Sequence, residues 1–343
     1  MRAFVVTGPG QHALSEVDEP VPGPGEVLVA PASVGICGSD LEILDGRRPA
    51  EYVTYPLVPG HEWAGRVVAC GPDVRGIEPG TPVVAEGVRA CGVCARCAEG
   101  RNNVCTGEYA ETGFTHPGAL AERLVVPAGQ VHPLGGDRPV VPAALIEPAA
   151  CVATGLLEVG LPAPGSRVAA VGDGALGLLA VALLRLTQPR ELMLLGSRPE
   201  RTAHGRALGA TGTALRREVN VADLYGAYDL VVECTNSTSG AASAIGMARR
   251  AGTVVLLGIS GAEQPSIDAD TIVLNHLRVQ GVFASSRRAW RWLVGLYDEG
   301  LFDPSPLITH RFGLDDVGKA LDVLGDRSAG AVKVVVLPNR STG

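Results

Sequence analysis

Short runs of alternating hydrophobic and polar residues, separated by proline and glycine, fill the first 150 positions of the chain. Alternation with a period of two, bounded by turn residues, predicts β-strands. Two clear turn signals are Pro22-Gly23-Pro24-Gly25 and Glu78-Pro79-Gly80. The predicted strands are residues 2–7, 26–32, 65–70, 82–85 and 120–126. A compact β-rich domain is therefore expected here.

The pattern changes near residue 167, where short apolar runs begin to alternate with segments of helical periodicity. Strands are predicted at 168–171, 192–195, 228–233, 253–258 and 278–283, and helices at 176–186, 201–208 and 241–250. This alternation is typical of a doubly wound α/β domain, a parallel sheet with helices on both faces.

The last part of the chain is expected to return to the β-rich domain. Amphipathic helices are predicted at 289–299 and 314–324, followed by a strand at 332–337 and a loose tail at 339–343. A chain of 343 residues suits two domains. We therefore predict one domain over 1–150, completed by 287–343, and a second over 151–286.

Charge and hydropathy restrict the partners of the protein. The net charge of −7 argues against a nucleic-acid partner, because binding to phosphate backbones requires a basic surface. The N-terminus turns polar at once, unlike a signal peptide, and the most apolar stretch, 175–184, is too short to span a bilayer. We expect a cytoplasmic protein that acts on a small molecule.

Four cysteines are concentrated in one loop: Cys91, Cys94, Cys97 and Cys105. Their spacing suits tetrahedral thiolate coordination of one zinc ion and leaves no position open for substrate. Such closed sites hold structure. The alternative is a pair of disulfides, which is typical of secreted proteins.

The predicted strand 168–171 runs directly into Gly172-Asp173-Gly174-Ala175-Leu176-Gly177, and a predicted helix follows. A GxGxxG motif in this position permits a tight turn and close approach of the backbone to a pyrophosphate at the helix N-terminus. The motif therefore predicts a dinucleotide coenzyme. The alternative is a tight turn that binds no ligand.

The second strand of this domain ends in Gly196-Ser197-Arg198-Pro199. NAD-binding proteins usually place an acidic residue there, to bind the ribose hydroxyls. Here Ser197 can donate a hydrogen bond and Arg198 offers a cationic fork for phosphate oxygens. This segment favours NADP(H), with Arg201 and Arg216 as further cationic candidates and Glu200 expected to point away.

Three other segments carry candidate metal ligands: Cys37-Gly38-Ser39-Asp40, Gly60-His61-Glu62 and Glu147-Pro148. Together they offer a thiolate, an imidazole and carboxylates. A mixed ligand set that leaves one position for water or substrate is what a catalytic zinc requires. Each residue also has a simpler interpretation: a buried thiol, a core histidine or a carboxylate at a helix start.

Several motifs occur in a familiar order across nearly the whole chain: Val34 to Asp40, Pro59 to Glu62, the four-cysteine loop, Gly118 to Glu122, Glu147-Pro148 and the glycine motif. In this order the sequence resembles the zinc-containing medium-chain dehydrogenases, which include alcohol, polyol, threonine and glucose dehydrogenases. The resemblance implies a GroES-like catalytic domain and a Rossmann domain for NADP.

The resemblance also implies two zinc ions per chain. Cys37, His61 and Glu147 would hold the catalytic ion, and either Glu62 or water would complete its shell. Cys151 competes with Glu147, because simple alcohol dehydrogenases use a ligand near that position. The four-cysteine loop would hold the structural ion.

In this family zinc acts as a Lewis acid on the substrate oxygen while hydride passes between the substrate carbon and nicotinamide. By resemblance, Ser39 relays the substrate proton and Asp40 orients His61. Thr154 would pack against nicotinamide. Glu42 either continues the relay or contacts substrate hydroxyls, and His116 is either a pocket residue or a plain loop histidine.

Polar residues near the expected pocket, namely Glu42, His116 and Arg47-Arg48, favour a polyhydroxylated secondary alcohol or ketone: a sugar, polyol or aminocyclitol. Residues 105–113 likewise resemble aldose and polyol dehydrogenases. Two alternatives stay open: an NADP-dependent reductase of simple secondary ketones, which the 196–199 segment also resembles, and a non-catalytic NADPH-binding protein. Relatives imply a homodimer or homotetramer, for which 278–283 would supply a sheet edge.

Overall fold

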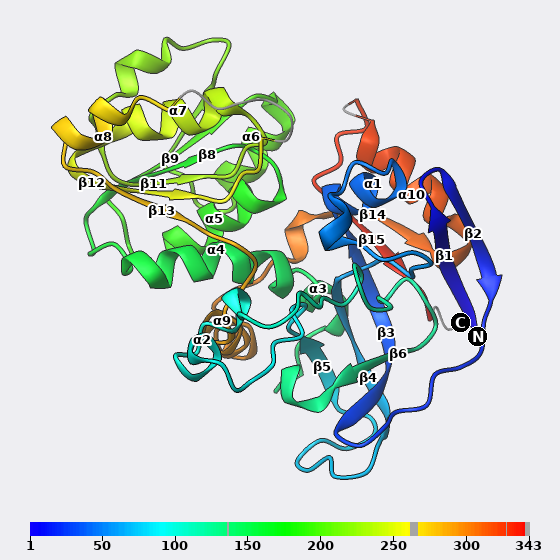
Figure 1. Ribbon diagram of the computed structural model, residues 1–343. Helices are drawn as coiled ribbons and strands as arrows, with labels where there is room; N and C mark the ends of the chain where they lie inside the picture. The colour runs from blue at the N-terminus through cyan, green and yellow to red at the C-terminus, as the bar shows by residue number, and fades with distance from the viewer. Residues whose placement is uncertain (136, 261–266, 327, 340–343) are drawn as a thin grey trace. The chain divides into compact units, whose positions relative to one another are not determined.

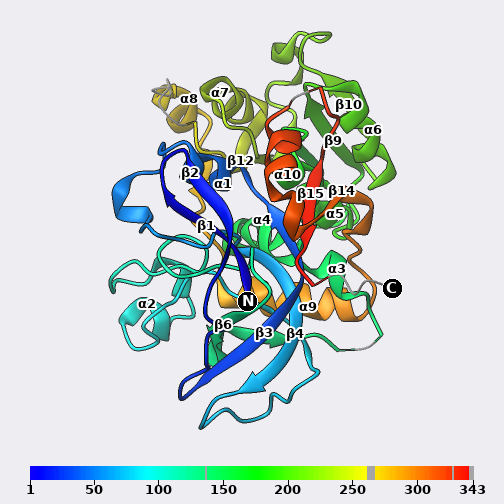
Figure 2. The same cartoon turned by 90° about the vertical axis from the view of Figure 1, so that its right-hand side faces the viewer.

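The computed structural model describes residues 1–343 apart from 136, 261–266, 327 and 340–343. Two compact units make up the chain (Figures 1 and 2). Unit 1 combines Met1–Glu147 with Ser285–Gly343, and unit 2 is Pro148–Ala284. Unit 1 is therefore built from both ends of the sequence.

Unit 1 is mainly β-structure. Its strands are β1 (Arg2–Gly8), β2 (Gln11–Glu16), β3 (Glu26–Ile36), β4 (Glu62–Cys70), β5 (Pro82–Ala85), β6 (Leu124–Pro127), β7 (Val131–Pro133), β14 (Ile308–Gly313) and β15 (Lys333–Leu337). β1 and β2 form a hairpin, and the larger sheet has the order β14-β15-β3-β4-β5-β7, with β6 also paired to β3. Figure 1 shows the red strand β15 beside the blue strand β3, far apart in sequence.

Few and mostly short helices accompany this sheet. They are α1 (Gly38–Leu44), α2 (Ala95–Ala98), α3 (Val140–Ala143), α9 (Arg287–Asp298) and α10 (Val317–Gly325). α9 buries Ala289, Trp290, Leu293, Val294 and Tyr297. This spacing of three and four residues is that of an amphipathic helix with one face in the core.

Unit 2 is a six-stranded parallel sheet of order β10-β9-β8-β11-β12-β13. Its strands are β8 (Arg167–Val171), β9 (Glu191–Gly196), β10 (Gly212–Leu215), β11 (Tyr228–Glu233), β12 (Ala248–Leu256) and β13 (Arg278–Gly281). Its helices are α4 (Ile146–Val159), α5 (Ala175–Arg185), α6 (Pro199–Ala207), α7 (Thr238–Met247) and α8 (Ala269–Leu274). Figure 1 shows α7 and α8 on one side of the sheet and α4 and α5 on the other. The predicted α/β fold class is confirmed.

Some element boundaries differ from the prediction. Residues 248–250, expected at the end of a helix, begin strand β12, because Ala248 pairs with Tyr228 of β11. Strand β2 was not predicted, since nearly all its side chains are exposed and show no buried alternation. Asn339, expected in a loose tail, donates hydrogen bonds to the carbonyls of Pro31 (2.9 Å) and Glu122 (3.0 Å), while 340–343 lie outside the described residues.

No helix in the described part of the chain is long and apolar enough to cross a membrane.

Candidate active site and metal centres

Cys37 lies at the junction of β3 and α1. It is the N-cap residue of α1, and its backbone N–H donates to Asp40 Oδ2 at 2.8 Å. A carboxylate in the first turn accepts a hydrogen bond from a free N–H group at the helix N-terminus, and its negative charge is stabilised by the positive end of the helix dipole. The thiol is thereby held at a fixed position at the end of β3.

His61 and Glu62 follow a turn that needs glycine. Gly60 has φ +98°, and a Cβ there would lie 2.9 Å from Val34 and 3.0 Å from the backbone nitrogen of Leu120. Glu62 then begins β4, paired with Gly35 of β3. Ligand atoms of Cys37, His61 and Glu62 lie within 4.8 Å of one another, so the structure brings together residues from two strands.

Asp40 lies close to His61 as well as to Cys37. Its Oδ1 lies 3.7 Å from His61 Nδ1, and both side chains are buried. Burial raises the pKa of the Asp40 carboxyl. Burial acts to lower the pKa of His61, but Cys37 and Asp40 outweigh it and the pKa lies well above its usual value. Asp40 thus contacts the backbone of one candidate ligand and faces the ring of another.

Glu62 forms a buried ion pair with Lys333 of β15, whose side chain is also buried. Sequence reasoning missed this partner. The available signal was a lysine within an otherwise apolar strand, Val332-Lys333-Val334-Val335-Val336, in a chain with only two lysines. A charged residue in such a run requires a buried partner.

Glu147 lies in the first turn of α4 and is almost fully buried. Its pKa is raised to about 8, mainly by burial and then by the charges of Glu62 and Glu111, against the opposing effect of His61. Among the described residues at this site, the ligand atoms that lie within 4.8 Å of one another belong to Cys37, His61 and Glu62, and Glu147 is not part of this group, although the charges of His61 and Glu62 act on its carboxyl. A thiol, an imidazole and a carboxylate form a donor set that fits a divalent cation. Cys151 lies one turn further along α4, in unit 2.

The predicted catalytic residues lie on helix α1 and on the loop that contains His116. Ser39 is in the first turn of α1, and its buried Oγ has no hydrogen-bond partner among the described residues. Glu42, on the same helix, has Oε2 at 3.8 Å from Arg48 Nη1. His116 contacts the Thr115 hydroxyl at 3.2 Å, and burial lowers its pKa, with a smaller effect from the Arg89 charge.

A polar cluster lies beside His61 and includes Arg48, one of the polar residues expected near the pocket. We call Arg48, Tyr109, Glu111 and Phe114 the Arg48 cluster. The centre of the Phe114 ring lies 4.7 Å from the centre of the His61 ring and 4.2 Å from the Arg48 guanidinium. Tyr109 donates a hydrogen bond to buried Glu111, whose pKa is raised by burial.

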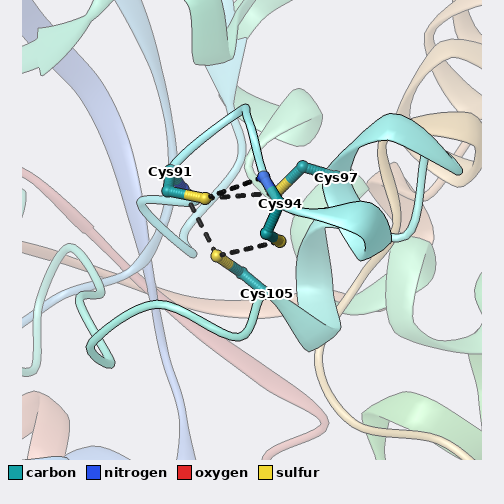
Figure 3. A group of neighbouring side chains, drawn as sticks. All are labelled: Cys91, Cys94, Cys97 and Cys105. Carbon is teal, nitrogen blue, oxygen red and sulfur yellow. Dashed lines mark hydrogen bonds between the residues drawn. The ribbon is translucent and has the colours of Figure 1, made fainter.

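The four cysteines of the loop face a common centre (Figure 3). The Sγ atoms of Cys91 and Cys97 are 4.0 Å apart and those of Cys94 and Cys105 3.9 Å, and all eight cysteines of the chain are free thiols. Tetrahedral Zn–S bonds place sulfurs about 3.8 Å apart. Backbone N–H groups of Thr106 and Cys97 lower the pKa of Cys94 to about 5. This geometry fits zinc.

A buried polar network connects this four-cysteine loop to the rest of unit 1. Glu86 accepts hydrogen bonds from Arg287 Nε (2.7 Å) and Asn102 Nδ2 (2.5 Å), and lies 3.0 Å from His132 Nε2. The backbone N–H of Arg287 donates to Asn102 Oδ1 at 2.7 Å. The loop is therefore fastened to the start of α9.

In unit 2 the glycine motif forms a tight strand-to-helix turn. Gly172 has φ +114°, and a Cβ on Gly177 would lie 1.8 Å from the Gly172 carbonyl oxygen. Gly174 is the N-cap residue of α5, and Ala175 and Leu176 are the first two residues of that helix. The backbone can thus approach a pyrophosphate at a helix N-terminus.

The adjacent turn after β9 contains Gly196, Ser197 and Arg198. Ser197 is exposed and Arg198 half-buried. Arg216 donates through its side chain to Ser243 Oγ (2.9 Å) and to the Ser239 carbonyl (3.3 Å), so its guanidinium is engaged by α7.

Thr154 lies on α4 and is buried. Its hydroxyl donates to the Ala150 carbonyl at 2.7 Å, one turn back along the helix. The hydroxyl proton is used within the helix, so we expect Thr154 to contact a bound coenzyme mainly through packing.

Comparison with known proteins covers both units. The model of the alcohol dehydrogenase GroES-like domain matches residues 23–136, and that of the glucose dehydrogenase C-terminus matches 143–337. The L-threonine 3-dehydrogenase of Deinococcus radiodurans is 30% identical over 97% of each chain. The chain belongs to the zinc-containing medium-chain dehydrogenases. The predicted family and an oxidoreductase activity are thereby confirmed.

Two solved structures extend the likeness to the whole fold. A protein from Sinorhizobium meliloti 1021, assigned as a zinc-binding dehydrogenase and bound to NADP, is 31% identical with a TM-score of 0.90, over 98% of this chain and 99% of its own. An alcohol dehydrogenase from E. coli CFT073, complexed with NADH, is 26% identical with a TM-score of 0.91, over the same shares. This medium-chain dehydrogenase is therefore similar to proteins that carry either coenzyme.

Proposed function

We propose that this dehydrogenase transfers hydride between NADP(H) and a polyhydroxylated secondary alcohol or its ketone, of the sugar, polyol or aminocyclitol class. The observation that carries the substrate class is the Arg48 cluster. The cluster contains a guanidinium, a phenol and a carboxyl, and its Phe114 ring contacts both Arg48 and the candidate ligand His61.

The Arg48 cluster contains both donors and acceptors, which hydroxyl groups need. Arg48 keeps its Nε buried with no hydrogen-bond partner among the described residues, and Glu42 lies near its other end. A pocket for a simple ketone would gain nothing from burying these groups, because unsatisfied polar atoms cost free energy. The L-threonine named for one relative is itself a polar secondary alcohol.

Two zinc ions per chain are part of the proposal. Cys37, His61 and Glu147 would hold the catalytic ion, with Glu62 exchanging with water, and the four cysteines would hold the structural ion. Bound zinc supplies a Lewis acid that polarises the substrate oxygen. Lys333 offsets the charge of Glu62 and keeps that carboxylate beside the site.

The protein's own residues would handle the substrate proton. The Ser39 hydroxyl, next to Asp40 on α1, has no hydrogen-bond partner among the described residues and can accept a hydrogen bond from the substrate hydroxyl. Glu42 lies one turn further along α1 and can receive the proton or bind a neighbouring hydroxyl. Asp40 holds the backbone at Cys37 in place.

The preference for NADP(H) rests on Ser197 and Arg198 at the end of β9, where NAD-binding relatives usually carry a carboxylate. Arg201, half-buried on α6, adds a second guanidinium. We expect kcat/KM with NADP⁺ to exceed that with NAD⁺ by at least about tenfold. A preference for NAD⁺ would overturn the coenzyme assignment.

A substrate panel tests the reaction. Sugars, polyols, aminocyclitols and small secondary alcohols are each offered with NADP⁺, and the corresponding ketones with NADPH. Sites built to bind hydroxyls reject analogues without them by factors on the order of 10⁴. Turnover of 2-propanol or 2-butanol far above every polyol would replace our proposal with the simple-ketone reductase.

Matched variants link the panel to the Arg48 cluster. Arg48→Met keeps apolar contact with Phe114 but removes the donors, and it should raise KM for the preferred polyol by roughly 10–100-fold with little effect on 2-butanol. Arg47→Met is the control, because Arg47 is exposed and pairs only with Asp45 among the described residues. Equal losses for both substrates would exclude a role in hydroxyl binding.

We also propose a homodimer or homotetramer. β13 is the edge strand of the unit 2 sheet, and exposed apolar side chains lie near it in sequence: Val273, Leu274 and Phe283. Edge strands with apolar neighbours are usually covered by another chain. Light scattering of the eluted protein should give a mass of two or four chains, and a monomer would contradict this.

A further inference from the structure

Asp173, the second residue of the glycine motif, connects the two nucleotide-binding turns of unit 2. Its Oδ2 accepts hydrogen bonds from the backbone N–H groups of Ser197 and Arg198, both at 2.7 Å. Its Oδ1 accepts from the Ser197 hydroxyl at 3.2 Å. Hydrogen bonds from backbone N–H groups to a carboxylate are short and strong. The turn after β9 is therefore anchored to the turn after β8.

Asp173 is buried and packs closely against the backbone of Gly196. The side chain is buried, with 4% of its surface exposed. A Cβ on Gly196 would lie 2.9 Å from both Cβ and Oδ2 of Asp173 and 2.5 Å from Thr202. Only glycine at position 196 lets the carboxylate lie against the backbone of the next turn.

Cationic residues lie at the end of this turn and just after it. Arg198 precedes α6 and Arg201 lies in its first turn, both half-buried. The pKa of Arg201 is lowered by burial and then by the positive charge of Arg198. Close like charges favour a bound anion between or beside them.

We propose that Asp173 is a positioning residue for coenzyme selectivity: it fixes the backbone of Ser197 and Arg198 so that their side chains meet the 2′-phosphate of NADP(H). Asp173 itself faces the protein backbone and not the phosphate. The inference rests on the proposed NADP(H) preference. The competing interpretation is that its carboxylate repels the 2′-phosphate.

Two nucleotides separate these interpretations, because 2′,5′-ADP and 5′-AMP differ only in the 2′-phosphate. Their dissociation constants are measured by calorimetry on the full-length wild type, Asp173→Ala and Asp173→Asn, with Asp223→Ala as an exposed control in unit 2. We expect Asp173→Ala to weaken 2′,5′-ADP about tenfold and 5′-AMP by less than about twofold. Asp173→Asn, which keeps one acceptor oxygen, should lie between wild type and Asp173→Ala.

Other results would overturn the inference. Equal weakening of both nucleotides would make Asp173 a structural residue only, and tighter 2′,5′-ADP binding by Asp173→Asn would establish repulsion. If the wild type discriminates but both variants keep its ratio, the positioning role alone fails. If the wild type does not discriminate, the NADP(H) assignment fails with it. Thermal unfolding identifies a variant that does not fold, and Asp173→Asn then decides the matter.

Discussion

Cys37 and Cys94 have the same side chain in different settings. Cys37 lies between a strand and a helix beside His61 and Glu62, whereas Cys94 shares its loop with three other cysteines. With zinc bound as we propose, the first set would leave a coordination position for substrate and the second would not. Identical substitutions at the two positions should therefore have different consequences.

Cys37→Ser should leave a folded protein with turnover reduced on the order of 10³-fold or more, because a Lewis acid is worth several kcal/mol at the transition state. Cys94→Ser should instead lower the unfolding midpoint by about 5 °C or more. Steady-state rates measure the turnover and circular dichroism measures the unfolding midpoint, and the zinc content of both variants is determined alongside. The reverse pattern would refute this division between the two centres.

The Asp40→Asn variant tests whether Asp40 supports the catalytic centre, because it leaves all the candidate zinc ligands in place. In Asp40→Asn an amide replaces the carboxylate that faces both the Cys37 backbone and His61. Loss of such a supporting group typically costs about 10–100-fold in metal affinity or activity. Zinc titration against a chelator measures the first and kcat/KM the second. Asp45→Asn, exposed at the end of the same helix, is the control and should match the wild type. Wild-type values in Asp40→Asn would contradict the role.

At the scale of elements, the four-cysteine loop depends on more than its own ligands. Glu86→Gln keeps the size of the side chain but removes the charge that Arg287 and Asn102 contact. Breaking a buried pair costs about 3–5 kcal/mol, and partial exposure of Arg287 should bring this value to the lower end. Denaturant unfolding measures the loss.

The matched control for that prediction lies in the same loop. Glu99→Gln removes an exposed ion pair with Arg96, which should change stability by no more than about 1 kcal/mol. Similar losses in the two variants would show that the loop responds to charge in general and not to the Glu86 network.

Sequence reasoning succeeded where chemistry is local. The cysteine spacing, the glycine motif and the strand-helix alternation of unit 2 depend on neighbouring residues, so their patterns can be read directly. The partners of those motifs could not be read in the same way. Lys333 reaches Glu62 only because β15 lies beside β3, and Asp173 reaches Ser197 only because β8 lies beside β9. Strand order is a property of the tertiary fold.

At the scale of the whole molecule, β15 holds unit 1 together. Val334, Val335 and Val336 are fully buried, and the strand lies between β14 and β3. Burying each valine contributes about 1.5–3 kcal/mol. A chain that ends at Gly330 should therefore lose folded unit 1 and all activity, as measured by limited proteolysis and rate assays. A chain that ends at Asn339 should behave as the full protein, and an active Gly330 truncation would disprove this role.

The position of β15 also bears on how the protein is made. A ribosome releases unit 2 in full before β15 emerges, so the end of β3 at residues 34–36 keeps one edge unpaired until β15 has been made. Unpaired edges invite association with other chains. Glu62 likewise lacks its ion-pair partner Lys333 until β15 has been made. A nascent chain therefore carries a complete nucleotide fold before its reaction centre is complete, and that centre is complete only after β15 has been made.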